Sequence, residues 1–92
     1  MSQINITAMD PGRFGVELSE GPDTTNHEVR VPETLLDDLG VAGVDPEVVV
    51  RESMEFLLER EPASSILPAF SLDDIPRYFP EYKDELKARL AG

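Results

Sequence analysis

The sequence contains no cysteine, so disulfide bonds and thiolate metal sites are excluded, and folding does not require an oxidising compartment. It contains a single histidine, His27, which excludes a metal site built from two histidines. There is no glycine-rich phosphate loop, and the paired acidic residues lack the alternating spacing of a calcium loop. No nucleophile motif accompanies His27. We therefore expect a non-enzymatic protein without metal or cofactor.

Long apolar runs are also missing. No stretch approaches the roughly 18 apolar residues that suggest a membrane helix. The first residues, Met-Ser-Gln-Ile-Asn-Ile, lack the charged and apolar regions of a secretory signal. These two features predict a cytoplasmic protein that does not enter a membrane.

Basic residues are few. The 92 residues include 8 Lys and Arg against 19 Asp and Glu, which gives a formal net charge of -11. Such a charge repels phosphate backbones and anionic lipids, so it disfavours nucleic acid and membrane surfaces as partners. A basic protein partner fits better, although solubility alone also explains an acidic surface.

Apolar and polar residues alternate in three stretches of residues 1–31, which predicts three strands. The inward-facing side chains would be Ile4, Ile6, Ala8, Phe14, Val16, Leu18, His27, Val29 and Val31. Pro11-Gly12 predicts a tight turn between the first two strands. The sequence thus predicts an α+β fold in one small domain, residues 1–92. A three-stranded antiparallel meander (1–31) would precede three to four helical segments.

A helical pair is predicted over residues 32–61. Pro32-Glu33 would open a short helix that Gly40 closes, and Asp45-Pro46 would start a longer helix that ends before Pro62. The apolar arc of the longer helix spans more than half its circumference. It therefore predicts a second contact besides the sheet, either with the C-terminal segment or with another copy of the chain. The dimer-interface candidates are Val49, Ser53, Phe56 and Leu57.

The remaining segment, residues 62–92, is rich in proline and in apolar residues, and it ends in a predicted helix that begins at Pro80-Glu81. Ser71 and Asp74 have the spacing of a capping box. Tyrosine and phenylalanine are frequent anchors of protein interfaces. The partner-binding candidates are Phe70, Tyr78, Phe79 and Tyr82. The same side chains could instead pack on the longer helix and complete the core. Of the two we predict packing, because eight apolar or aromatic residues between Ile66 and Tyr82 are more than a free arm usually exposes.

Residues 29–39 contain a strand followed by Pro32-Glu33 and paired leucines, and residues 48–60 carry Arg51-Glu52-Ser53 in the second helix. This pattern resembles the ribbon-helix-helix family over about residues 29–60. The resemblance implies a dimer in which the strand pairs with its twin and enters the DNA major groove. Arg30 would be the base-reading residue. Members of the family serve as repressors or as antitoxins.

Taken together, the sequence predicts a protein-interaction module whose partner is another protein, possibly basic in charge, or a second copy of the same chain. A ribbon-helix-helix-like antitoxin or transcription regulator is the alternative.

Overall fold

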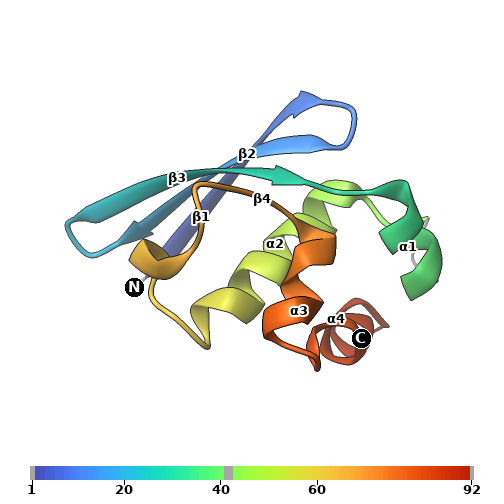
Figure 1. Ribbon diagram of the computed structural model, residues 1–92. Coiled ribbons are helices and arrows are strands. Elements are labelled where there is room, and N and C mark those ends of the chain that lie inside the picture. The colour runs from blue at the N-terminus through green and yellow to red at the C-terminus, as the bar shows by residue number, and fades with distance from the viewer. Residues whose placement is uncertain (1, 41–42, 92) are drawn as a thin grey trace.

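A four-stranded sheet covers the helices on one side in the computed structural model, which describes residues 2–40 and 43–91 (Figure 1). The strands lie in the order β1-β2-β3-β4. Their bounds are β1 (Ser2–Asp10), β2 (Arg13–Glu20), β3 (Asp23–Arg30) and β4 (Ala69–Ser71). The α+β class predicted from the sequence is confirmed.

The first three strands form the antiparallel meander that the alternation predicted. Ile6 lies opposite Val16, which in turn lies opposite His27, so the inward side chains share one face. The turn between β1 and β2 places Gly12 at φ 78°, where a side chain would be strained. The Gly12 carbonyl accepts a hydrogen bond from the Val31 amide at 2.7 Å, which ties this turn to the end of β3.

The predicted number of strands was wrong, because β4 adds a fourth. It pairs in parallel with β3, with Val29 opposite Phe70. Only three residues long, β4 has no alternating pattern that the sequence could reveal. It forms because the chain returns to β3, where the Glu28 amide donates to the Pro68 carbonyl at 2.8 Å.

The described residues contain four α-helices and two short 3₁₀ helices. The bounds are α1 (Glu33–Leu39), α2 (Pro46–Leu58), α3 (Ile75–Tyr78), α4 (Tyr82–Ala91) and the 3₁₀ turns Ala63–Ser65 and Leu72–Asp74. The predicted start of α2 is confirmed, whereas α2 ends at Leu58, earlier than the predicted end before Pro62, and α4 begins at Tyr82 and not at Pro80-Glu81. The Asp45 carboxylate accepts from the Glu47 amide at 2.9 Å. Ser71 and Asp74 form the predicted capping box. None of the described helices is long and apolar enough to cross a bilayer.

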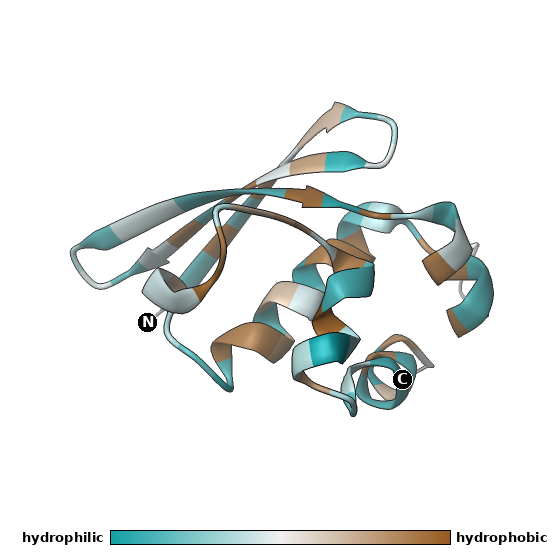
Figure 2. Ribbon diagram, in the orientation of Figure 1, coloured by the Kyte–Doolittle hydropathy of each residue, from teal (hydrophilic) through white to brown (hydrophobic). Residues whose placement is uncertain are grey.

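The core lies between the sheet and α2, whose hydrophobic residues recur along its length, while the end of the β2–β3 hairpin is hydrophilic (Figure 2). Helix α2 contacts β1 on one side and α4 on another. The second contact of α2 is thus with the C-terminal segment of the same chain.

The four dimer-interface candidates lie inside a single chain. Val49, Ser53 and Phe56 are fully buried, and Leu57 is 4 % exposed. Most residues of the predicted apolar arc of α2 are buried. Their burial within one chain does not fit a dimer interface formed by these side chains. The cause is α4, which covers the part of α2 that the sheet leaves open. Self-association remains a prediction, and it would need another surface.

Candidate functional site

An open hollow of about 270 Å³ lies between the end of α2 and residues 65–79, a segment that contains β4 and α3. The buried side chains of Ile66 and Ile75 and the 4 % exposed Leu57 contribute to its apolar lining. Phe70 and Phe79 also line the hollow and are half-buried. The hollow is therefore an apolar site that is open to solvent.

Two large apolar side chains of this lining are conspicuously exposed. Tyr78 is 69 % exposed and Leu67 is 52 % exposed. A folded chain normally keeps such side chains scattered, so their position at one apolar hollow marks a candidate contact surface. We call Leu67, Phe70, Tyr78 and Phe79 the rim of the hollow. Three of the four partner-binding candidates are in this group.

Tyr82, the fourth candidate, is fully buried. Its hydroxyl lies 2.7 Å from Ser53 Oγ, and Ser53 Oγ lies 2.7 Å from the Val49 carbonyl oxygen. Because a carbonyl only accepts, Ser53 donates to Val49 and Tyr82 donates to Ser53. Burial raises the pKa of Tyr82 to about 12. Tyr82 therefore belongs to the core and not to the hollow.

Aromatic packing and a charged network hold the hollow's wall in place. The Phe56 ring meets the rings of Phe79 and Tyr82 edge to face, with centroids 5.9 and 5.3 Å apart. The Arg60 guanidinium lies 3.6 Å from the centroid of the Phe56 ring. Such a stack contributes about 0.5–2 kcal/mol according to its burial.

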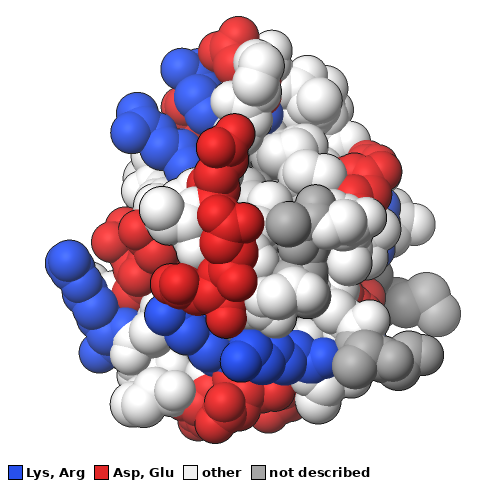
Figure 3. Space-filling view, turned by 90° about the vertical axis from the view of Figure 1, so that its right-hand side faces the viewer, with Lys and Arg blue, Asp and Glu red and all other residues white. Residues whose placement is uncertain are grey.

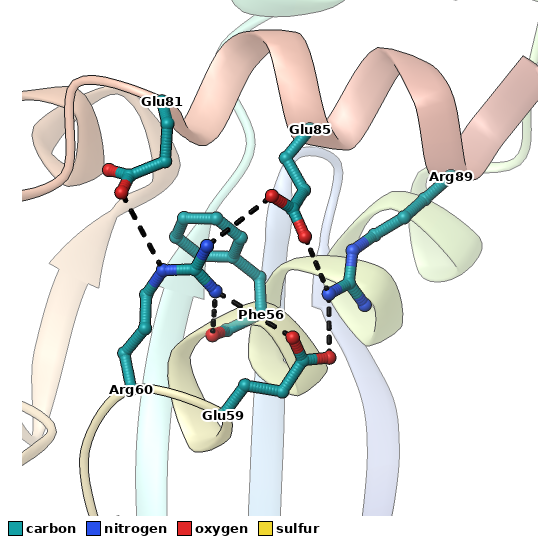
Figure 4. Close-up of polar contacts among 6 residues, drawn as sticks. All are labelled: Phe56, Glu59, Arg60, Glu81, Glu85 and Arg89. Atoms are coloured by element: carbon teal, nitrogen blue, oxygen red, sulfur yellow. Dashed lines mark hydrogen bonds and ion pairs between the residues drawn. The ribbon is translucent and has the colours of Figure 1, made fainter.

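Figure 4 shows how Arg60 joins the end of α2 to the C-terminal segment. Arg60 donates to the Phe56 carbonyl at 3.1 Å and to the Glu85 carboxylate at 3.3 Å. Arg89 donates to Glu59 at 2.6 Å and to Glu85 at 3.2 Å. Each exposed pair alone is worth little, but the shared carboxylates link the pairs into one network that fixes α4 against α2.

His27 does not line the hollow, but its side chain is hydrogen-bonded to the backbone of the rim residue Leu67. It is 6 % exposed, and its Nδ1 lies 2.7 Å from the Leu67 carbonyl oxygen. Since a carbonyl cannot donate, Nδ1 carries the proton, and in neutral His27 Nε2 accepts from the Thr25 hydroxyl at 2.8 Å. Sequence reasoning predicted a packed histidine but could not find the Leu67 carbonyl, because the contact spans 40 positions.

The charged residues of the lining are both acidic. They are Glu61 and Asp74, and Asp74 also accepts from the Ser71 amide at 3.3 Å. On the face that Figure 3 presents, basic side chains lie beside acidic ones without forming a continuous basic surface. Within residues 2–40 and 43–91, no group of three His, Asp or Glu residues lies close enough together to hold a metal ion. The arrangement offers an apolar hollow with carboxylates beside it.

The strand that the ribbon-helix-helix resemblance would place in a ribbon is paired on both sides. Residues 28–30 of β3 lie between β2 and β4, with Arg30 opposite Arg13 and Ser71. The exposed Arg30 therefore stands on an internal strand. Comparison of the chain with protein-family models, with curated proteins and with solved structures found no match.

Proposed function

We propose that the protein is a non-enzymatic interaction module that binds another protein through the hollow between α2 and the β4–α3 segment. The observation that carries this proposal is the exposure of Tyr78 and Leu67 beside half-buried Phe70 and Phe79. Aromatic side chains held on a rigid support bind with little ordering cost, and they dominate interface energetics. Here the support is the Phe56 stack and the Arg60 network.

The partner would present one or two apolar side chains flanked by basic residues. The hollow accepts the apolar group, while Glu61 and Asp74 attract cations. The net charge of -11 adds a long-range attraction for a basic segment, which speeds encounter more than it strengthens the complex. Binding should therefore weaken as salt rises.

The ribbon-helix-helix-like antitoxin or transcription regulator stays the alternative from the sequence. No specific observation favours it, because β3 has both edges occupied along residues 28–30.

The test uses a random dodecapeptide library displayed on phage and selected against the immobilised protein. Enriched peptides should carry aromatic or aliphatic residues next to Lys or Arg. Replacing Tyr78 by alanine should weaken their binding about tenfold or more, as expected for an interface anchor. The unfolding midpoint should barely move, because Tyr78 is 69 % exposed. Fluorescence anisotropy with labelled peptides measures the affinities, and urea titration measures the stability.

Val48→Ala provides the matched control, since Val48 is 44 % exposed on α2 and is not in the lining. That variant should bind the peptides as the parent does. A selection without enrichment, or peptides that bind Tyr78→Ala as tightly as the parent, would refute the hollow as the binding site. Enriched peptides without basic residues would refute the charge argument alone.

A further inference from the structure

Strand β1 forms an open edge of the sheet. It is nine residues long and pairs with β2 on one side, while the opposite edge is the three-residue β4. Edge strands usually carry charged residues or proline that prevent pairing with another chain. Residues 3–9 of β1 contain neither. The pairing of β1 with β2 shifts register between Ala8 and Asp10, so the strand is irregular at that end. From Gln3 to Ala8 the edge has neither a bulge nor a charge nor a proline to protect it.

One contact identifies which backbone groups point outward. Arg51 of α2 donates from Nη1 to the Ile4 carbonyl at 3.2 Å, so the polar groups of Ile4 face away from β2. In an antiparallel ladder the residues alternate between the two sides of the strand. The amides and carbonyls of Ile6 and Ala8 therefore point to the open edge as well. Arg51 covers the Ile4 end of that edge and leaves the other end accessible.

From this edge we infer that β1 pairs antiparallel with β1 of a second copy of the chain, around a two-fold axis at Thr7. Ile6 of each copy would exchange hydrogen bonds with Ala8 of the other. The pairing would end at Ile4, where Arg51 keeps its contact. The two sheets would join into one, with their polar faces on the same side.

Two features of this edge fit a second copy of the chain. The pairing is self-complementary. Ile6 and Ala8 flank Thr7 and both direct their amides and carbonyls to the open edge, so Ile6 of each copy meets Ala8 of the other across an axis at Thr7. Charge opposes the pairing least at this edge, because residues 3–9 are uncharged, whereas β2 and β3 carry Arg13, Glu17, Glu20, Asp23, Glu28 and Arg30. Two chains of net charge -11 meet with least repulsion along such a strand.

Salt separates this dimer from binding at the hollow. Salt screens the repulsion between two acidic copies, so it should tighten the dimer. The same rise in salt should weaken the binding of a basic peptide at the hollow. The two proposals can therefore fail independently, and Tyr78→Ala should leave the dimer unchanged.

The test compares Thr7→Lys with Thr24→Lys. Both threonines are exposed, and both changes add one positive charge. In the proposed pairing the two Thr7 residues lie directly opposite each other at the closest spacing of an antiparallel ladder, about 4.5 Å between Cα atoms. Two lysines there would repel, whereas Thr24 lies on β3 next to β2. We expect Thr7→Lys to weaken dimerisation about tenfold or more, and Thr24→Lys to leave it unchanged or tighten it slightly.

Sedimentation equilibrium from micromolar to millimolar protein, at low and high salt, measures the dimer against the 10.2 kDa chain. Amide exchange supplies the second readout, because the Ile6 and Ala8 amides should become protected as concentration rises. The inference fails if only the single chain sediments throughout, or if the dimer is as tight in Thr7→Lys as in the parent. It also fails if a dimer forms while exchange at Ile6 and Ala8 stays independent of concentration.

Discussion

Replacing Phe56 by alanine is expected to lower the free energy of unfolding by about 3–5 kcal/mol, a large share of the roughly 5–15 kcal/mol that stabilises a small domain. Phe56 is fully buried, and its ring contacts both Phe79 and Tyr82. Its removal would leave a cavity between α2 and α4. It would also take away the ring on which Arg60 stacks at 3.6 Å. The change thus affects packing and the charged network together.

Urea unfolding followed by circular dichroism measures this loss. Phe79→Ala is the matched control, because Phe79 meets the same ring but is only half-buried, and its replacement should cost clearly less. If the two variants unfold at the same urea concentration, Phe56 is not the centre of the packing described above. A loss below about 1 kcal/mol for Phe56→Ala would likewise contradict it.

Stability should fall at alkaline pH, and the cause should be Tyr82. Its pKa is raised to about 12 by burial, whereas in the unfolded chain it is near the ordinary value of about 10. The raised pKa contributes stability that is complete below pH 10 and is lost as pH rises through 12. Two pKa units correspond to about 3 kcal/mol. Unfolding free energies measured between pH 8 and 12 should show a decline of this order.

Tyr82→Phe isolates this effect. The variant lacks the hydroxyl, so its stability should decline less between pH 10 and 12. At neutral pH it should lose only about 1 kcal/mol, because Ser53 keeps its hydrogen bond to the Val49 carbonyl. Tyr78→Phe, changed at an exposed position, should follow the parent curve. A Tyr82→Phe curve parallel to that of the parent would rule out Tyr82 as the cause.

Local sequence signals predicted the elements that local interactions form. Asp45 and Pro46 marked the start of α2, Ser71 and Asp74 formed the expected capping box, and alternation identified the meander. These features depend on residues a few positions apart. They could therefore be deduced from sequence spacing alone.

The sequence could not reveal what depends on distant parts of the chain. Tyr78 and Tyr82 are four positions apart in the sequence, yet Tyr78 is 69 % exposed and Tyr82 is fully buried. The break after α3 turns the chain so that Tyr82 meets Ser53, a partner that no local pattern specifies. Ser53 did give a signal, since a polar residue within an apolar arc needs a buried hydrogen-bond partner. Residues 62–90 accordingly divide between core and surface, with Leu72 and Leu86 buried and Leu67 exposed.

The hydrogen bond from His27 to the Leu67 carbonyl, across 40 positions, has a consequence for the order of folding. Contacts between distant residues close a long loop, and the entropy of that closure delays their formation. The hairpins of the meander close short loops and can form early. The hollow can be complete only when β4 has returned to β3, so capacity to bind a partner would appear last as the chain folds. By the same reasoning it would be the first property lost when the C-terminal part opens locally.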